Sequence, residues 1–333
     1  MQRKLYTLSV IGCGRWGAFI AKYLSDLGHA VTLYGRAGSR KTEELFSTRR
    51  NALMELPAAV STTTSLSDAV SGAEILVVSI PSQNLRGLLR ELAALPALPE
   101  TLVLCMKGLE IGTGKRLSTV AREELGDGVK VAVWIGPGHV QAFCAGIPNC
   151  MVIDSSNREV KEKLVKAFNS DLIRFYLGTD LIGSEIGAAA KNVIGIAAGM
   201  LDGLHYTSLK GALMARGTRE IARLIAALGG NEFSAYGLCH LGDYEATLFS
   251  PWSHNRKFGE EFVQGKRFEK LAEGVMTSKA LYRLGQQHHV DLPIVESVYK
   301  VLFEGADIED SIRKLFVRAV KQEFERQVSE DGN

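Results

Sequence analysis

The segment LYTLSVIGCGRWGAFIAKYLSDLGHAVTLY, from Leu5 to Tyr34, decides the fold of this chain. Read in order, it predicts a strand over 5–11, a helix over 18–27 and a second strand over 29–34. The letters GCGRWG at 12–17 form a G-x-G-x-x-G turn between the first strand and the helix. A strand, a glycine-rich turn, a helix and a strand within about 30 residues are the fingerprint of a dinucleotide-binding unit.

Each of the three glycines has a separate expected role. Gly12 allows the tight turn, Gly14 lets a pyrophosphate approach the backbone, and Gly17 lets the helix pack close to the strand. The free N–H groups at the helix N-terminus then face the phosphates. The segment therefore predicts a dinucleotide cofactor.

The residue after the second strand indicates which dinucleotide is preferred. An NAD site expects Asp or Glu there, whereas an arginine suits a 2′-phosphate. Here Arg36 follows the strand, and no acidic residue appears before Glu43. We expect NADP(H) as the preferred cofactor, with Arg36 near the adenosine phosphate. In the alternative, the enzyme uses NAD(H) and Arg36 stacks on adenine.

Continuous apolar runs continue through the first half and predict a parallel sheet that is covered on both faces. The expected strands are 74–80, 101–106, 130–135, 150–154 and 172–177, with helices over 84–95, 114–125 and 159–169. Ligands of such sheets bind beyond the carboxyl ends of the strands. Lys107 follows one of these strands and is therefore placed to meet a ligand, although a solvated turn lysine is the alternative.

From Gly178 onward, apolar residues recur at helical spacing. The expected helices are 182–204, 211–228, 277–287, 294–303 and 308–327. The predicted fold class is therefore α/β, with a Rossmann-like doubly wound sheet over 1–178 followed by an all-α domain over 179–333. A cleft between two such domains is a usual place for a substrate.

Lys191 and Asn192 lie side by side within the apolar helix over 182–204. Burying an ammonium without a counter-charge is costly, so such a lysine usually shifts its pKa or finds a partner. A lysine in that state can exchange a proton near neutral pH. The alternative is a lysine whose stem is buried and whose head reaches water.

Composition is that of an ordinary globular chain. Its 333 residues suffice for about two domains, and the net charge of +2 indicates neither a nucleic acid nor an anionic membrane as partner. The five cysteines are widely spaced without a C-x-x-C pair, so we expect no metal site, no disulfide framework and a reducing, cytoplasmic location. Oligomeric state is left open, with a homodimer as the first candidate.

We expect neither a secretory leader nor a membrane span. The chain starts on a strand pattern and not on a long apolar signal region. The longest apolar stretch, Ile182 to Leu204, is interrupted by Glu185, Lys191, Asn192 and Asp202.

Several short motifs occur together in a specific order along the chain. They are Gly12-x-Gly14-x-Trp16-Gly17, Lys107-Gly108, Gly136-Pro137, Glu185 with Lys191-Asn192-Val193-Ile194, Gly242-Asp243 and Ser253-x-Asn255-Arg256-x-Phe258-Gly259. In order and spacing, the chain resembles the bacterial NAD(P)-dependent glycerol-3-phosphate dehydrogenases from about residue 5 to 317.

The resemblance implies reversible hydride transfer between dihydroxyacetone phosphate and sn-glycerol 3-phosphate, a precursor of phospholipids. It implies that Lys191 is the proton donor and acceptor, with Lys107 and Asp243 beside it as catalytic residues. The implied substrate contacts are Lys107, Gly136, Gly138, Lys191, Asn192, Asp243, Ser253, His254, Asn255 and Arg256. The implied cofactor contacts are Gly12, Gly14, Arg15, Trp16, Gly17, Arg36, Lys107, Val140, His254, Leu271 and Glu273.

Two departures from the family pattern concern the substrate. Gly138 stands where the family usually has Ser or Thr. His254 stands where the family has an arginine that contacts substrate phosphate and cofactor, and a histidine is a weaker anion ligand near pH 7. These departures leave three hypotheses open: a glycerol-3-phosphate dehydrogenase, a dehydrogenase of the same fold with another hydroxyl or carbonyl substrate, and a cofactor-binding protein without turnover.

Overall fold

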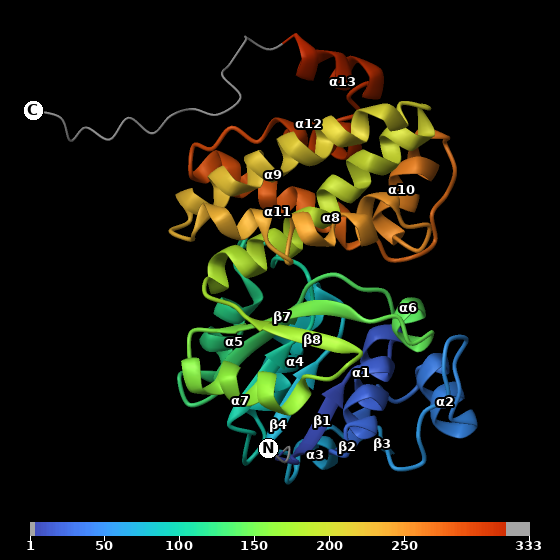
Figure 1. The fold of residues 1–333 in the computed structure, drawn as a ribbon, viewed down its shortest axis with the longest axis vertical. Helices are drawn as coiled ribbons and strands as arrows, with labels where there is room; N and C mark the ends of the chain where they lie inside the picture. The colour runs from blue at the N-terminus through green and yellow to red at the C-terminus, as the bar shows by residue number, and fades with distance from the viewer. Residues whose placement is uncertain (1–3, 318–333) are drawn as a thin grey trace, which may run out of the picture.

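The computed structural model of this protein describes residues 4–317. A sheet with its flanking helices occupies the lower half of Figure 1, and a helical part occupies the upper half. The predicted fold class is confirmed, because an eight-stranded sheet is followed by a helical C-terminal region.

The sheet has the strand order β3-β2-β1-β4-β5-β6-β7-β8. Its strands are β1 Thr7–Ile11, β2 Ala30–Tyr34, β3 Ser61–Thr63, β4 Ile75–Val78, β5 Thr101–Leu104, β6 Lys130–Ile135, β7 Asn149–Ser155 and β8 Ile173–Leu177. Neighbouring strands are parallel except for β6 and β7, which are antiparallel. The order reverses direction at β1, where β2 lies on one side and β4 on the other, and this is where doubly wound sheets bind ligands.

Two features of the sheet differ from the sequence prediction. The continuous apolar runs predicted parallel strands throughout, but β7 runs against β6. The short polar strand β3 has no apolar run and was not predicted. Neither feature changes the carboxyl ends of β1, β4 and β5, which lie at one edge of the sheet.

Helices cover both faces of the sheet, and the strands β4 and β5 are buried along their whole length. These helices are α1 Arg15–Asp26, α2 Arg40–Thr48, α3 Leu66–Val70, α4 Leu85–Ala93, α5 Leu117–Leu125, α6 Val140–Cys144 and α7 Arg158–Phe168.

The helical part is built around α8, Leu181–Gly203, which carries Lys191. Among the described residues it is the one helix long and apolar enough to cross a membrane, yet 83% of its 18-residue apolar window is buried inside the protein. Small residues let other helices approach it closely, since a Cβ added at Gly199 would lie 1.8 Å from the Arg256 carbonyl oxygen. The composition of α8 is therefore that of a core helix.

Among the described residues, four helices pack against α8: α9 Lys210–Ala227, α10 His254–Val263, α11 Glu273–Gln287 and α12 Pro293–Phe303. The helix α13, Ile308–Phe316, packs against α12 instead (Figure 1). The helix predicted over 277–287 begins four residues earlier, at Glu273. Of the helix predicted over 308–327, α13 accounts for the first nine residues, and residues 318–327 lie outside the described residues. A 3-10 turn over Leu241–Asp243 and a π-helical turn over Glu245–Phe249 join α9 to α10.

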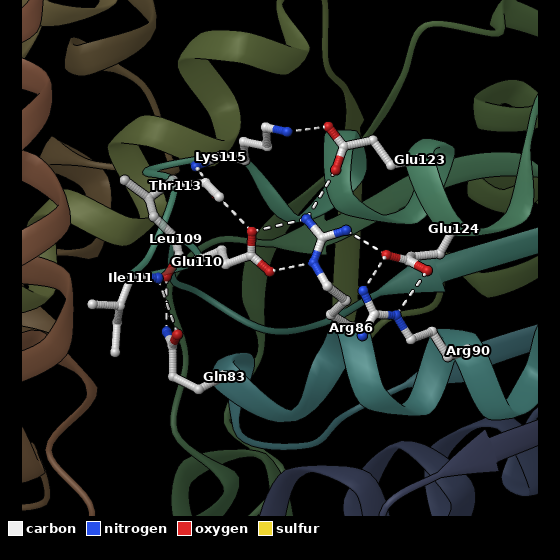
Figure 2. Close-up of polar contacts among 10 residues, drawn as sticks. All are labelled: Gln83, Arg86, Arg90, Leu109, Glu110, Ile111, Thr113, Lys115, Glu123 and Glu124. Carbon is white, nitrogen blue, oxygen red and sulfur yellow. Dashed lines mark hydrogen bonds and ion pairs between the residues drawn. The ribbon is translucent and has the colours of Figure 1, made fainter.

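The loop after β5, which carries Lys107, is held from outside by an ion-pair network (Figure 2). The Arg86 guanidinium on α4 lies between three carboxylates, with Glu110 at 2.6 Å and Glu123 at 2.8 Å, and with Glu124 as the third partner. Hydrogen bonding to Arg86 lowers the pKa of Glu110 to about 2. The network joins α4 and α5 to the loop.

A neutral side chain adds backbone contacts to the same loop. Gln83 donates to the Leu109 carbonyl at 2.8 Å and accepts from the Ile111 N–H at 3.1 Å, so its amide bonds the loop in both directions (Figure 2). The position of Lys107 is thus fixed by a supported loop.

Candidate active site

The glycine-rich turn between β1 and α1 is tightly packed on one side and open on the other. Gly12 has a φ of +110°, and a Cβ there would lie 2.2 Å from the Ser79 carbonyl oxygen. A Cβ at Gly17 would lie 1.8 Å from the Gly12 carbonyl oxygen. At Gly14, by contrast, no described atom lies within 4 Å of an added Cβ. The turn therefore fits a pyrophosphate that approaches the backbone at Gly14.

Two lysines and one aspartate meet beyond the carboxyl ends of β5 and β6. Lys191 Nζ on α8 lies 2.6 Å from Asp243 Oδ2, and Lys107 Nζ lies 2.8 Å from the same oxygen. Lys107 Nζ also donates to the Gly136 carbonyl at 2.6 Å, at the end of β6. The group joins three segments that are far apart in the sequence.

Burial shifts the pKa of Lys191, one member of this group. Lys191 is 6% exposed, and burial lowers its pKa to about 8, although Asp243 attracts the ammonium and partly opposes that shift. The charge of Lys107 lowers the pKa of Lys191 further. A lysine with such a pKa can give and take a proton near neutral pH.

One oxygen of Asp243 lacks a partner. Its Oδ1 is buried and has no hydrogen-bond partner among the described residues, whereas Oδ2 serves both lysines. An unpaired buried carboxylate oxygen is costly, so it indicates a place where a ligand donor is expected. A ligand hydroxyl is the simplest such donor.

Thr247 is a site residue that the sequence analysis missed. It lies in the π-helical turn, accepts from Lys191 Nζ at 2.8 Å and donates to the Asp243 carbonyl at 2.7 Å. π-Helical turns occur often at functional sites. The available signal was its position one turn after Asp243, too weak to single it out.

Asn192 fixes the loop that carries Lys107. Its side-chain amide donates to the Lys107 carbonyl at 3.1 Å. The adjacent residues Lys191 and Asn192 are thus both linked to Lys107. Lys191 shares Asp243 with it, and Asn192 binds its backbone carbonyl.

The end of β6 leaves no room for a side chain at Gly138. This residue has a φ of +143°, and a Cβ there would lie 2.4 Å from the Phe143 ring. His139 follows and donates from Nε2 to the Ala246 carbonyl at 2.7 Å. Burial lowers the pKa of His139, so this ring favours its neutral form. In this conformation, position 138 has no room for the Ser or Thr side chain that the family resemblance leads one to expect.

The N-terminal ends of α10 and α11 border the lysine group. The Asn255 side chain accepts from the Gly274 N–H at 2.9 Å. Its Cβ would lie 3.4 Å from a Cβ added at Gly195, which is one turn after Lys191 on α8. Glu273 accepts from the Ser82 N–H at 3.2 Å and so reaches the carboxyl end of β4. Burial raises the pKa of Glu273.

Ser253 and Arg256 contact other parts of the protein. The Ser253 hydroxyl accepts from the Arg256 N–H at 3.3 Å and caps α10. The Arg256 guanidinium lies 2.6 Å from Asp202 and 3.4 Å from Glu260, near the C-terminal end of α8. The structure therefore does not bring the Arg256 side chain to Lys191, because Asp202 already pairs with it.

Arg15 of α1 and His254 of α10 form a contact between the two parts. Arg15 Nη2 lies 3.1 Å from His254 Nε2, and His254 Nδ1 lies 3.1 Å from the Leu271 carbonyl oxygen. Burial and the charge of Arg15 lower the pKa of His254. This contact joins the glycine-rich turn to the start of α10.

The remaining predicted cofactor residues surround the same turn or the end of β2. Arg36 is exposed just beyond the carboxyl end of β2. The Trp16 ring stacks on Phe19 at a centroid distance of 5.4 Å, and Val140 is buried at the start of α6.

Comparisons with known proteins agree along the whole chain. The family model for the NAD-dependent glycerol-3-phosphate dehydrogenase N-terminus matches residues 7–161, and the model for its C-terminus matches residues 180–313. A glycerol-3-phosphate dehydrogenase [NAD(P)+] of Thermoanaerobacter sp. is 37% identical over 328 residues, covering 95% of this chain and 98% of that protein. One of Geobacillus kaustophilus is 36% identical, covering 96% of each chain.

Solved structures give the same result. The crystal structure of glycerol-3-phosphate dehydrogenase from Coxiella burnetii aligns with a TM-score of 0.88 at 25% identity, covering 94% of this chain and 99% of that one. From its two matched domain models and its full-length relatives, this chain belongs to the NAD-dependent glycerol-3-phosphate dehydrogenase family.

Proposed function

We propose that this protein catalyses reversible hydride transfer between dihydroxyacetone phosphate and sn-glycerol 3-phosphate with a nicotinamide cofactor. The observation that carries the proposal is the Lys107–Asp243–Lys191 group, which lies beyond the carboxyl ends of β5 and β6 in a chain whose glycine-rich turn is open at Gly14. Full-length relatives of that activity support it.

Lys191 is the proposed acid and base. An ammonium has three donors, and Lys191 uses one on Asp243 and one on Thr247, which leaves one for a substrate oxygen. In the reduction, this donor gives a proton to the oxygen on C2 while charge develops there, and in the oxidation the neutral amine takes it back. The cofactor, when bound, supplies or accepts the hydride.

Lys107 and Asp243 set the charge around that proton transfer. Lys107 adds a second positive charge that stabilises a developing alkoxide. Asp243 Oδ2 holds both ammonium groups in place, and its unpaired Oδ1 is the proposed acceptor for a substrate hydroxyl. Asn192 and the Gly136 carbonyl position Lys107 from two sides.

NADP(H) is the proposed preferred cofactor, with NAD(H) accepted less well. Arg36 beyond β2 supports this preference, because a guanidinium suits a 2′-phosphate and no acid precedes Glu43. Arg36→Ala is expected to raise KM for NADPH about tenfold or more and KM for NADH much less. Equal increases for both cofactors would contradict the preference.

A substrate panel with both cofactors tests the reaction. We expect NADPH oxidation with dihydroxyacetone phosphate and NADP+ reduction with sn-glycerol 3-phosphate. Turnover of another hydroxyl or carbonyl compound in place of these would assign a different substrate to the same site. Tight NADPH binding with no turnover at millimolar dihydroxyacetone phosphate would leave a binding protein instead.

Three further expectations belong to the same proposal. The dinucleotide-binding domain is assigned to 1–178 and the helical domain to 179–333, because β8 ends at Leu177 and α8 begins at Leu181. A cytoplasmic location is supported by five free cysteines. A homodimer would be detected by light scattering on the purified chain.

A further inference from the structure

Arg15 and His254 form the contact between the glycine-rich turn and α10. Arg15 is the first residue of α1. It directly follows Gly14, where no described atom lies within 4 Å of an added Cβ. His254 is the first residue of α10, and its neighbour Asn255 packs at Gly195 on α8. The pair therefore joins the glycine-rich turn to the start of α10, which packs against α8.

The hydrogen bonds assign the tautomer of His254. The Leu271 carbonyl can only accept, so the hydrogen must be on Nδ1. Nε2 then carries a lone pair and accepts from the Arg15 guanidinium at 3.1 Å. His254 is thus a neutral ring that holds an arginine, and the positive charge at this place belongs to Arg15.

Arg15 has binding capacity to spare. A guanidinium has five N–H donors, and the His254 contact occupies one of them. Arg15 is exposed and forms no ion pair with a carboxylate of the described residues. The family resemblance leads one to expect a phosphate-binding arginine at position 254, where this chain has the neutral histidine.

We propose that Arg15 binds a ligand phosphate beside the glycine-rich turn and that His254 is its positioning residue. The charge expected from α10 is supplied from α1 instead, by a group that can bind phosphate oxygens through two parallel N–H bonds. The inference rests on the proposed function for its two phosphate sources, the substrate phosphate and the cofactor pyrophosphate.

Calorimetry on the full-length protein tests this without turnover. Inorganic phosphate, sn-glycerol 3-phosphate and NADPH are titrated into the wild type and Arg15→Gln. Loss of a charge-assisted contact is expected to weaken inorganic phosphate by about tenfold or more. A matching loss for sn-glycerol 3-phosphate assigns the substrate phosphate, and one for NADPH assigns the pyrophosphate. Unchanged affinity for all three ligands overturns the proposal.

Arg174→Gln is the matched control, because it removes an exposed arginine from β8 at the far edge of the sheet. It is expected to leave all three affinities unchanged. If Arg174→Gln weakened the three affinities as much as Arg15→Gln does, the Arg15 effect would come from the change in net charge. That result would overturn the assignment.

Two variants of the partner test positioning. His254→Phe removes the acceptor and is expected to weaken phosphate several-fold, whereas His254→Gln keeps an acceptor oxygen and should retain affinity. The double variant Arg15→Gln with His254→Arg moves the positive charge from α1 to α10 and should restore phosphate binding. Failure of this double variant to bind phosphate would show that Arg15 acts through local structure and would overturn the proposal.

These titrations separate the inference from the proposed function. A protein that binds phosphate through Arg15 but does not reduce dihydroxyacetone phosphate keeps the inference and loses the function. A protein that turns over but binds all three ligands equally well without Arg15 keeps the function and loses the inference.

Discussion

The buried Lys107–Asp243–Lys191 group and the exposed Arg15–His254 pair are two polar clusters on either side of the proposed substrate site. In the first, each charged side chain contacts groups from other segments, and Asp243 is 1% exposed. In the second, one hydrogen bond joins two side chains at the protein surface. Replacing a member of the buried group leaves an unpaired buried charge, whereas the surface pair can exchange its members. A substitution at residue 254 should therefore cost less stability than one at Lys107, Lys191 or Asp243.

The largest expected effect is at Lys191. Lys191→Ala should lower kcat by about 100-fold to 10,000-fold, because it removes the proton donor, while the Kd of NADPH stays unchanged. Steady-state kinetics and a fluorescence titration of NADPH measure the two quantities. Lys210→Ala is the control, since Lys210 is also a buried lysine and pairs with Asp202 at 2.6 Å. It should lower the melting temperature without a comparable fall in kcat.

The pH dependence should have opposite signs in the two directions. The pKa of Lys191 is lowered to about 8, and reduction requires its protonated form. The kcat for reduction should therefore fall as pH rises through about 8, and the kcat for oxidation should rise. Asp243→Asn removes the attraction that opposes this shift, so both profiles should move to lower pH. Profiles that slope the same way in both directions would exclude Lys191 as the titrating group.

A smaller effect is expected at Thr247. Thr247→Val keeps the shape but removes the hydroxyl that accepts from Lys191, and kcat should fall by about threefold to tenfold. Thr247→Ser keeps the hydroxyl and should retain most of the activity. If the serine variant lost as much as the valine variant, the methyl group and not the hydroxyl would be the important part.

The smallest expected effect is at the support of the Lys107 loop. Arg86→Gln removes the side chain that pairs with Glu110, Glu123 and Glu124, so the melting temperature should drop by a few degrees and KM for dihydroxyacetone phosphate should rise a few-fold. Arg90→Gln is the matched control, because Arg90 is more exposed and pairs with Glu124 alone. If both variants raised KM equally, the ion-pair network around Arg86 would not be what holds Lys107 in position.

Local patterns in the sequence predicted most of the fold. The turn at 12–17, the buried strands β4 and β5 and the helix α8 follow from glycine spacing and apolar runs, which are properties of neighbouring residues. The strand β3 has three residues of mixed burial and carries no such pattern. The direction of β7 depends on pairing with β6, which no single run encodes.

The site was predictable in its residues but not in its contacts. Lys107, Lys191 and Asp243 could be named from motifs, and the structure brings both lysine Nζ atoms within 2.8 Å of Asp243 Oδ2. The Arg15–His254 contact spans 239 residues of sequence, and no local pattern links its members. Arg256 lies beside Asn255 in sequence, but the helix turns its side chain to Asp202.

In the π-helical turn over Glu245–Phe249, we expect activity to depend on the number of residues as well as on their identity. Such a turn closes i→i+5 hydrogen bonds and so holds one residue more than an α-helical turn. Deleting one residue there would let the segment close as an ordinary helix and would rotate the following side chains by about 100°. The number of residues in this turn therefore decides whether the Thr247 hydroxyl meets the Lys191 ammonium.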